Sequence, residues 1–410
     1  MKEYDLIIIG AGAAGMTAAV LVAGSRLKVA LVEKNSQCGR KLLLTGKGRC
    51  NITNTRPWEE MSVHIHPDSA FFRQAFMSFS NRDVIAMFRS LGLPVVEERG
   101  MRVFPKSGRS ADVRDVLLER IVSSENISLE YNSEVVSVDR TADDRFLLDI
   151  MRSEDKISTY RLMASSVIVA TGGLSYPATG STGDGYRIAR KFGHTVTPTM
   201  PSLTALVPDK YNFALAGLTM RNVSLSLLVD GGTVQTEFGE LTFTDGGLEG
   251  ALGFRVSRKA VKALGAGKKV EVLIDLKPAV STEELKARIE REYRTGMNLS
   301  RFLERFIPLQ AVRPFMDADS SLNVQNLPVR LKNWRLRIKD FVDYRRAVVT
   351  AGGVSLKEIS RKTMESKLVP GLYFAGEVMD LDADTGGYNL QIAFSTAAAA
   401  ARSVMNRSTL

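Results

Sequence analysis

A glycine-rich turn of the form G-x-G-x-x-G stands near the start of the chain, between segments that predict a strand and a helix. The apolar run "YDLIIIG" leads into Gly10, and the alanine-rich run "MTAAVLVAGS" follows Gly15. A second apolar run, "KVALVE", ends at Glu33. Short apolar runs separated by a helix are typical of parallel strands that are buried on both faces. The order therefore predicts a βαβ unit and an α/β fold of the Rossmann type.

The turn has the spacing that a dinucleotide requires. Gly10 permits a tight turn, Gly12 lets a pyrophosphate approach the backbone, and Gly15 allows close packing of helix and strand. The N–H groups at the helix start, at Ala13 and Ala14, add a partial positive charge for the phosphates. The turn therefore predicts dinucleotide binding.

Glu33 is the second part of this fingerprint. It closes the second strand, 18 residues after Gly15, where an acid accepts hydrogen bonds from ribose hydroxyls. An acid at this place favours an unphosphorylated ribose, as in NAD or the ADP half of FAD. A polar loop follows the strand and a matching segment occurs near the C-terminus, which favours the extended cofactor FAD.

The length of 410 residues predicts more than one domain. We expect a Rossmann-like FAD-binding domain, residues 1–195 and 346–410, interrupted by an inserted domain, residues 196–345. The insert shows strand-like alternation and a charged helical part near residues 280–310. A helix is expected from Ser110, with Ser110 as its cap. The final segment, "NLQIAFSTAAAAARSVM", predicts a long alanine-rich helix.

The chain carries a net charge of +10, and its densest basic segment lies at residues 330–346. That segment is interpreted as a half-exposed strand with a solvated face, and nucleic-acid binding through it is kept as a remote alternative. Two cysteines, Cys38 and Cys50, give no disulfide framework. Neither a signal peptide nor a membrane span is expected, so the expected location is the cytoplasm. The oligomeric state is left open.

Several long motifs resemble one known family. "GRKLLLTGKGRCNITN", "RVFPKSGRSADV", "VIVATGGLSYPATGSTGDGYRIARKFGH" and "GLYFAGEVMDLDADTGGYNLQIAFSTA" occur in the order found in a bacterial flavoprotein family that includes aminoacetone oxidase and a bile-acid dehydro-reductase. The resemblance spans the chain and is weakest in the insert. It implies FAD in a Rossmann-like domain, with the insert over the flavin. In the last helix, "FSTAAAAA" departs from the serine–glycine pair that is frequent in the family.

The resemblance gives each motif an expected role. Cations after the acidic strand would reach the pyrophosphate or ribityl chain, glycines would admit the ring, and side-chain donors would meet the flavin carbonyls and N5 region. Cys50 is expected as a buried neighbour of the flavin rather than a redox thiol. The predicted loop residues are Lys34, Arg40, Lys41, Thr45, Gly46, Arg49, Cys50, Asn51 and Asn54.

Further cofactor contacts are expected in the middle and at the end of the chain: Val135, Thr171, Gly172, Gly376, Glu377, Asp380, Asn389, Leu390 and Gln391. Tyr176 and Tyr186 are candidate proton donors. A metal is not expected, because the D-x-D-x-D at residues 380–384 lacks the glycine and distant glutamate of a calcium loop. The histidines at 64, 66 and 194 are expected to be structural.

These features predict an FAD-dependent oxidoreductase that transfers hydride at flavin N5. The family resemblance implies two competing activities, and the first expectation is NAD(P)H-dependent reduction of a conjugated carbon–carbon double bond in a 3-oxo steroid- or bile-acid-like substrate. The alternative is oxidation of a small primary amine by oxygen. The sequence alone identifies no catalytic acid or base.

Overall fold

The computed structural model describes residues 1–153, 157–294 and 296–407. It divides into two compact units, Met1–Thr199 with Val349–Leu410 (unit 1) and Met200–Val348 (unit 2). The predicted insert, residues 196–345, begins and ends a few residues earlier than unit 2.

Unit 1 is a mixed α/β unit. Its strands are β1 Lys2–Ile9, β2 Val29–Val32, β3 Thr53–Asn54, β4 Ile65–His66, β5 Val95–Glu98, β6 Arg102–Pro105, β7 Ile127–Glu130, β8 Ser133–Arg140, β9 Phe146–Ser153, β10 Ile157–Val169, β18 Val349–Ala351, β19 Leu372–Phe374 and β20 Asp382–Ala383. Its helices are α1 Ala13–Val22, α2 Arg40–Leu44, α3 Trp58–Ser62, α4 Ser69–Ser78, α5 Asn81–Ser90, α6 Ser110–Val122, α7 Asp184–Lys191 and α13 Tyr388–Arg407. Short 3-10 turns are η1 Thr45–Gly48, η2 Pro177–Thr179, η4 Leu356–Glu358 and η5 Gly376–Val378.

The main sheet of unit 1 has the strand order β7-β2-β1-β10-β9-β8, with β19 also paired to β10. Strands β7, β2, β1, β10 and β19 are parallel neighbours, whereas β9 runs antiparallel to β10. All four residues of β2 and the last four of β1 are buried, which explains their continuous apolar runs. The Rossmann-type α/β fold is thus confirmed, and β19 from the C-terminal segment completes its sheet.

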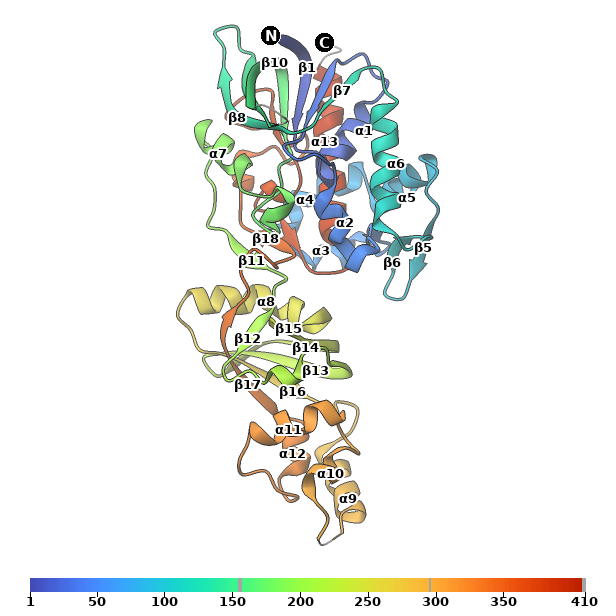
Figure 1. Ribbon diagram of the computed structural model, residues 1–410, viewed down its shortest axis with the longest axis vertical. Helices are drawn as coiled ribbons and strands as arrows, with labels where there is room; N and C mark the ends of the chain where they lie inside the picture. Colours follow the sequence, from blue (N-terminus) through green and yellow to red (C-terminus); the bar gives the residue numbers. More distant parts are fainter. Residues whose placement is uncertain (154–156, 295, 408–410) are drawn as a thin grey trace. The chain divides into compact units, whose positions relative to one another are not determined.

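Helices cover this sheet, and two of them carry the predicted cofactor motifs. Helices α1 and α13 pack closely against each other, and Figure 1 shows them side by side next to the sheet. Helix α13 is buried along most of its length through its alanines, whose small side chains allow a close approach to α1. The first and the last motif of the sequence therefore meet in one layer.

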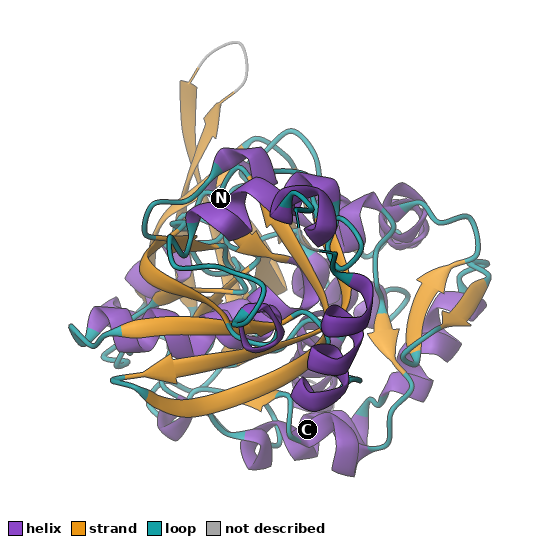
Figure 2. Ribbon diagram, turned by 90° about the horizontal axis from the view of Figure 1, so that it is seen from below, coloured by secondary structure: helices purple, strands orange, loops and turns teal. Residues whose placement is uncertain are grey.

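A small second sheet, β3-β6-β5, belongs to unit 1 but lies apart from the main sheet. Strands β5 and β6 form an antiparallel hairpin, and β3, which is formed by the last two residues of the polar loop 41–54, pairs with β6. The hairpin stands at one side of unit 1, at the right in Figures 1 and 2.

Unit 2 combines a barrel with helices. Its strands are β11 Met200–Ser202, β12 Leu206–Pro208, β13 Thr219–Val229, β14 Gly232–Thr244, β15 Gly247–Glu249, β16 Val270–Asp275 and β17 Trp334–Phe341. Its helices are α8 Gly250–Gly265, α9 Thr282–Glu292, α10 Leu299–Leu303, α11 Leu309–Asp317 and α12 Leu327–Leu331, with a 3-10 turn η3 Phe213–Leu215. The strands close in the order β12-β15-β14-β13-β16-β17. A separate apolar core fills this unit.

Two local features differ from the sequence interpretation. Ser110 is the first residue of α6 rather than its cap, and its hydroxyl donates to the carbonyl of Leu43 at 2.8 Å. Ser110 therefore ties α6 to α2 instead of capping its own helix. Helix α8 was not predicted, because its glycines at both ends and at Gly253 resemble a turn-rich segment.

Candidate functional site

The carboxyl ends of four strands meet at one edge of the main sheet. Ile9 of β1 pairs with Val32 of β2 and with Val169 of β10, and Val169 pairs with Phe374 of β19. The residues that follow these strand ends include Gly10, Glu33, Thr171 and Gly376. In open α/β sheets, ligands bind in the crevice outside the carboxyl ends of the strands. Motifs up to about 360 residues apart in sequence therefore share one candidate site.

The glycines of the first turn have distinct surroundings. Gly10 has a φ of +96°, and a Cβ there would lie 2.7 Å from the carbonyl oxygen of Ala170. A Cβ on Gly15 would lie 1.8 Å from the carbonyl oxygen of Gly10. A Cβ on Gly12 would meet no described atom within 4 Å. Gly10 and Gly15 are thus needed by the fold itself, whereas Gly12 keeps the backbone accessible to another molecule.

The start of α1 and Glu33 lie together. In the described part of the chain, no side chain caps α1, and Gly12 occupies the N-cap position. The Glu33 carboxylate is buried and accepts from the Ala11 N–H at 2.8 Å through Oε2. Its Oε1 accepts from the backbone and side-chain N–H groups of Asn35. These bonds fix the carboxylate beside the glycine turn, as a ribose contact requires.

The cations after β2 are held by protein partners. Lys34 Nζ forms an ion pair with Asp184 at 2.6 Å and donates to Thr182 at 2.5 Å. Arg40 is exposed and donates to the side-chain oxygen of Asn35 at 2.7 Å. Lys34 therefore joins the first motif to the N-terminus of α7.

Lys41 links the polar loop to the C-terminal motif. Its Nζ lies 2.7 Å from Oε2 of Glu377 and 3.0 Å from Oε1. Oε1 also accepts from the Thr350 N–H at 3.0 Å. Both side chains of the ion pair are mostly buried, so it contributes more to positioning than an exposed pair would.

Gly376 brings the same motif to α1 and α13. Its φ is +75°, and a Cβ there would lie 3.0 Å from the Cβ of Ala14. Its N–H donates to Oγ1 of Thr396 at 3.0 Å, and the Thr396 hydroxyl donates to the carbonyl of Ile392. Thr396 belongs to the segment that departs from the family pattern, and here it satisfies a buried backbone donor.

The polar loop combines left-handed backbone with one unpartnered atom. Gly46 has a φ of +57°, and the Thr45 hydroxyl donates to the carbonyl of Leu42 at 2.6 Å. Asn51 Oδ1 is buried and has no hydrogen-bond partner among the described residues. A buried carbonyl-type oxygen without a donor is costly, so it points to a bound group that supplies one.

Cys50 is buried beside Asn51. Burial raises the pKa of its thiol to about 12, against a weaker opposing effect of the hydrogen bond with Thr45. Burial also raises the pKa of the Cys38 thiol to about 11. Both are free thiols. Since the thiolate is the nucleophilic form, neither cysteine is activated for redox chemistry.

Two predicted donors of the loop are directed to protein groups. Arg49 forms an ion pair with Glu98, and its guanidinium lies 4.4 Å from the ring centroid of Phe104. Asn54 Nδ2 donates to the carbonyls of Gly100 at 3.0 Å and Gly386 at 3.2 Å. Both amide hydrogens of Asn54 are therefore in use, and this residue holds the loop against the hairpin and the start of α13.

The first turn of α13 contains the last predicted residues. Asn389 accepts from the Ala383 N–H and donates to the Ala383 carbonyl at 2.7 Å. Gln391 is fully buried, accepts from Thr53 at 2.5 Å and donates to the carbonyl of Phe79. Leu390 between them is half-buried. Asn389 thus fixes the loop that leads into the helix, whereas Gln391 joins α13 to β3 and to the end of α4.

The remaining predicted residues lie on the sheet or beside its edge. The carbonyl of Val135 accepts from Arg187 at 3.5 Å, and the N–H of Asp380 donates to Val354 at 2.9 Å. Gly172 has a φ of +72°. Thr171 packs on Gly185, where a Cβ would lie 2.4 Å from its hydroxyl oxygen.

The sequence analysis missed a cluster formed by two histidines and one carboxylate. His64 Nδ1 lies 2.9 Å from Asp384 Oδ2, and His66 Nε2 lies 3.2 Å from Asp384 Oδ1. The His64 ring stacks on Tyr388 at a centroid distance of 4.6 Å. Burial would raise the pKa of Asp384, but hydrogen bonds from both histidines outweigh it and lower the pKa to about 2. The only sequence signal was the spacing of H-x-H.

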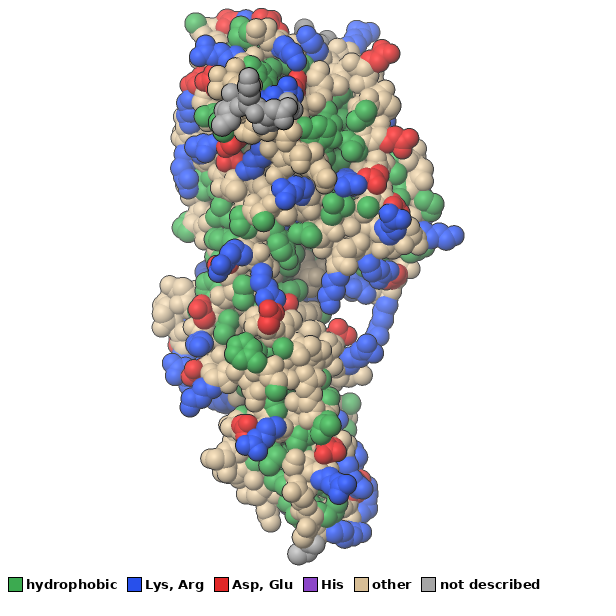
Figure 3. Space-filling view, in the orientation of Figure 1, with side chains coloured by type: hydrophobic (Ala, Val, Ile, Leu, Met, Phe, Trp, Pro, Cys, Tyr) green, Lys and Arg blue, Asp and Glu red, His purple; other side chains and the backbone are tan. Residues whose placement is uncertain are grey.

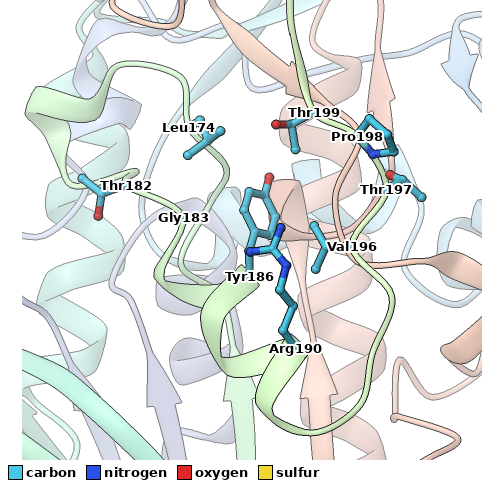
Figure 4. A pocket seen from close by; sticks show the side chains of 9 residues that line it. All are labelled: Leu174, Thr182, Gly183, Tyr186, Arg190, Val196, Thr197, Pro198 and Thr199. Atoms are coloured by element: carbon cyan, nitrogen blue, oxygen red, sulfur yellow. The ribbon is translucent and has the colours of Figure 1, made fainter.

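A pocket of about 440 Å³ lies in unit 1 beside the start of α7. Its wall combines Tyr186 and Arg190 of α7 with Leu174 and the segment 196–199, as Figure 4 shows. Leu174 follows Gly173, where a Cβ would lie 3.0 Å from Oε1 of Glu377. The pocket therefore adjoins the edge where the cofactor motifs meet, and it contains the candidate proton donor Tyr186.

The residues present suit FAD. Gly12 and the uncapped start of α1 suit its pyrophosphate, Glu33 suits a ribose diol, and Asn51 offers a buried acceptor. In the described residues, no group of three or more His, Cys, Asp or Glu side chains is arranged to hold a metal ion. Nor is any described helix both long enough and apolar enough to span a bilayer.

Fold and site together define an FAD-dependent oxidoreductase with a Rossmann-type domain. A family model described as "HI0933-like protein Rossmann domain" matches residues 4–403, and the chain belongs to this family. The predicted family resemblance is thereby confirmed.

Curated relatives match over almost their whole length. The chain is 30% identical to a 3-dehydro-bile acid delta(4,6)-reductase of Clostridium scindens, covering 98% of each chain. It is 33% identical to a ribosomal RNA dihydrouridine synthase of Escherichia coli, covering 99% of each chain. Among solved structures, 3-ketosteroid-delta4-(5alpha)-dehydrogenase from Rhodococcus jostii RHA1 aligns with a TM-score of 0.51 at 15% identity, covering 98% of this chain and 97% of that chain. At that identity the likeness shows the fold alone.

Proposed function

We propose that this protein is an NAD(P)H-dependent reductase that saturates a carbon–carbon double bond conjugated to a carbonyl, and that its substrate is a uridine base in ribosomal RNA. The full-length match to two relatives with different substrates carries the proposal. Dihydrouridine forms by saturation of the uracil C5=C6 bond, which is conjugated to the C4 carbonyl. A delta(4,6)-reduction of a 3-oxo steroid saturates the same kind of bond. The two relatives therefore share one chemistry, the saturation of a double bond conjugated to a carbonyl.

Charge favours RNA over a steroid. The net charge of +10 suits a polyanion, whose binding is dominated by its phosphates. A steroid requires a mostly apolar cavity. The pocket in unit 1 instead includes Arg190 and the threonines at 182, 197 and 199.

The residues of the site would divide the work among them. FAD, when bound, supplies the hydride for the double bond. Gly12 and the start of α1 would hold its phosphates, and the Lys41–Glu377 ion pair would fix the C-terminal motif against the polar loop. Tyr186 lines the adjoining pocket and is the candidate donor of a proton to the carbon next to the carbonyl. Neither buried cysteine would take part.

Product analysis under anaerobic conditions tests the proposal. The purified protein is reduced with NADH or NADPH, mixed with ribosomal RNA transcribed in vitro, and the RNA nucleosides are examined by mass spectrometry. We expect flavin reoxidation together with dihydrouridine. Saturation of a 3-oxo-4,6-diene bile acid without dihydrouridine would transfer the assignment to the steroid. Rapid bleaching by aminoacetone, with none by NAD(P)H, would replace the reductase by an amine oxidase.

A further inference from the structure

We propose that a cationic surface on unit 1 contacts the phosphates of the RNA substrate. The surface is formed by the η1 turn, the β5–β6 hairpin and the turn after β6, and its cations are Lys47, Arg49, Arg99, Arg102, Lys106 and Arg109. The inference rests on the proposed function, because it concerns the same RNA substrate. It differs in that it assigns RNA phosphates, rather than FAD, as the ligand of exposed cations, including Lys47 and Arg49 of the polar loop.

Aromatic packing brings the three segments together. The guanidinium of Arg49 lies 4.4 Å from the ring centroid of Phe104, and that of Arg102 lies 5.6 Å from it. Arg102 Nε donates to the carbonyl of Arg99 at 3.0 Å. A Cβ on Gly108 would lie 3.8 Å from Nε of Arg49. The η1 loop, the hairpin and the following turn therefore form one continuous surface rather than three separate charges.

This surface has an excess of positive charge. Arg49 pairs with Glu98, and Arg109 lies 3.7 Å from Asp112 with 71% of its side chain exposed. The other four cations are exposed, and the described part of the chain provides no ion pair for them. Figure 3 shows Lys and Arg side chains gathered over the β5–β6 end of unit 1. Exposed cations without an ion pair gain most from a polyanion, because they lose no carboxylate partner on binding.

Most cations of residues 330–346, the most densely basic segment of the sequence, have ion-pair partners. Ion pairs join Arg330 to Asp319 at 2.7 Å, Lys332 to Asp275 at 2.8 Å, and Arg346 to Asp245 at 2.8 Å. Arg335 and Arg345 also have acidic partners. Residues 330–346 are therefore largely neutralised within unit 2, and the remote nucleic-acid hypothesis moves from that segment to the hairpin of unit 1.

The cationic surface borders the candidate cofactor site. Arg49 directly precedes Cys50 and Asn51, so one loop contributes a cation outside and a buried acceptor inside. Asn54 bonds the carbonyl of Gly100 at the hairpin tip. Met101, also at the tip, is 41% exposed and offers an apolar contact for an unstacked base. A single carboxylate, as on a bile acid, would need one or two cations rather than six.

Charge reversal tests the surface in the intact flavoprotein. The variant combines Arg99→Glu, Arg102→Glu and Lys106→Glu, whose native side chains are exposed and outside the described ion pairs. The matched control combines Lys357→Glu, Arg361→Glu and Lys362→Glu, which are exposed residues of the C-terminal segment and change the net charge equally. Binding to a fluorescent oligouridine of about 20 nucleotides and to transcribed ribosomal RNA is measured by anisotropy over a range of salt concentrations.

The surface variant should bind RNA at least about tenfold more weakly at 0.1 M salt or thereabouts, with the slope of log K against log salt reduced by about 2. FAD content and the rate of flavin reduction by NAD(P)H should stay unchanged, and the control should bind as the wild type does. Equal weakening in both variants, or in neither, would overturn the inference, as would a wild type that does not bind RNA. If the reversed variant is unstable, the corresponding glutamine variants test the same effect at a smaller charge change.

The outcomes separate this inference from the proposed function. If the surface variant alone loses RNA binding and the wild-type protein forms no dihydrouridine, the binding surface is supported and the proposed reaction is rejected. Dihydrouridine formation with an unaltered KM in the surface variant would support the reaction and reject the surface.

Discussion

The Thr396 side chain holds Gly376 of the C-terminal cofactor motif in place through one hydrogen bond. It is buried in α13, and its hydroxyl oxygen accepts from the N–H of Gly376 at 3.0 Å. Gly376 in turn lies against Ala14 at the start of α1. A departure from the family pattern at this point therefore has a defined structural role, which the sequence alone did not reveal.

Thr396→Val should destabilise the protein by about 1–3 kcal/mol, because valine keeps the volume but leaves the Gly376 N–H without an acceptor. Urea unfolding of the apoprotein measures the change. Thr233→Val, at an exposed position of β14, is the control and should have little effect. Equal stability of Thr396→Val and the wild type would show that the hydrogen bond makes no net contribution.

The cysteines allow a second test at this scale. Because burial raises the pKa of Cys50 to about 12 and that of Cys38 to about 11, both thiols should resist alkylation at neutral pH in the folded protein. Thiol titration should find none in the native state and two after unfolding. Cys50→Ala should keep flavin reduction within about twofold of the wild type. Rapid labelling of native Cys50, together with loss of activity in Cys50→Ala, would restore it as a redox group.

Among the elements, the loop between β20 and α13 depends on the histidine–carboxylate cluster. Asp384 accepts from both His64 and His66, and strand β20 pairs with β4, which contains His66. The cluster therefore holds the segment that precedes α13 to the region after the polar loop. The H-x-H spacing gave no hint of this partner, because Asp384 is 318 residues away from His66.

Asp384→Asn should lower stability at neutral pH by about 2 kcal/mol, since the folded-state pKa is about 2 and the ordinary pKa of an aspartate is 3.8. A depressed carboxyl pKa stabilises the fold above the unfolded-state value. That stabilisation is lost as the pH falls from about 4 to about 2. Unfolding free energies of the variant and wild type should thus converge over this range. A constant difference down to pH 2 or so would reject the ionic role of Asp384.

At the scale of the whole molecule, the sequence predicted unit 1 much better than unit 2. The Rossmann turn, the apolar strands and the completing C-terminal strand have local signals, because parallel buried strands require continuous apolar runs. Barrel closure in unit 2 depends on pairings such as β12 with β17, more than a hundred residues apart, which periodicity does not encode. Helix α8 was not predicted, because its glycines are typical of turns.

In the candidate site, too, the sequence predicted the residues with local signals and missed the contacts between distant segments. The glycines, Glu33 and Glu377 were identified from their places after strands, and the structure brings these strand ends to one edge. The ion pair of Lys41 with Glu377 and the unpartnered oxygen of Asn51 depend on packing between distant segments. The distribution of charge likewise depends on the fold, because acidic partners neutralise the most basic segment of the sequence and leave the hairpin of unit 1 exposed.

Gly12 gives the most direct test that the glycine turn is there to hold FAD. Its φ of −80° suits any residue, and a Cβ there would meet no described atom within 4 Å. Gly12→Val should therefore leave the melting temperature of the apoprotein unchanged, while its side chain blocks the approach of the pyrophosphate. Gly15→Ala, whose Cβ would lie 1.8 Å from the carbonyl oxygen of Gly10, should instead destabilise the apoprotein.

The decisive measurement is a titration of apo Gly12→Val and apo wild type with FAD, followed by the visible absorbance of the bound flavin. We predict that the variant binds FAD at least about 100-fold more weakly, a loss of about 2.7 kcal/mol, with its fold intact. Binding of FAD by Gly12→Val with the affinity of the wild type would contradict the assignment of this turn, and with it the site, as the cofactor-binding centre of the protein.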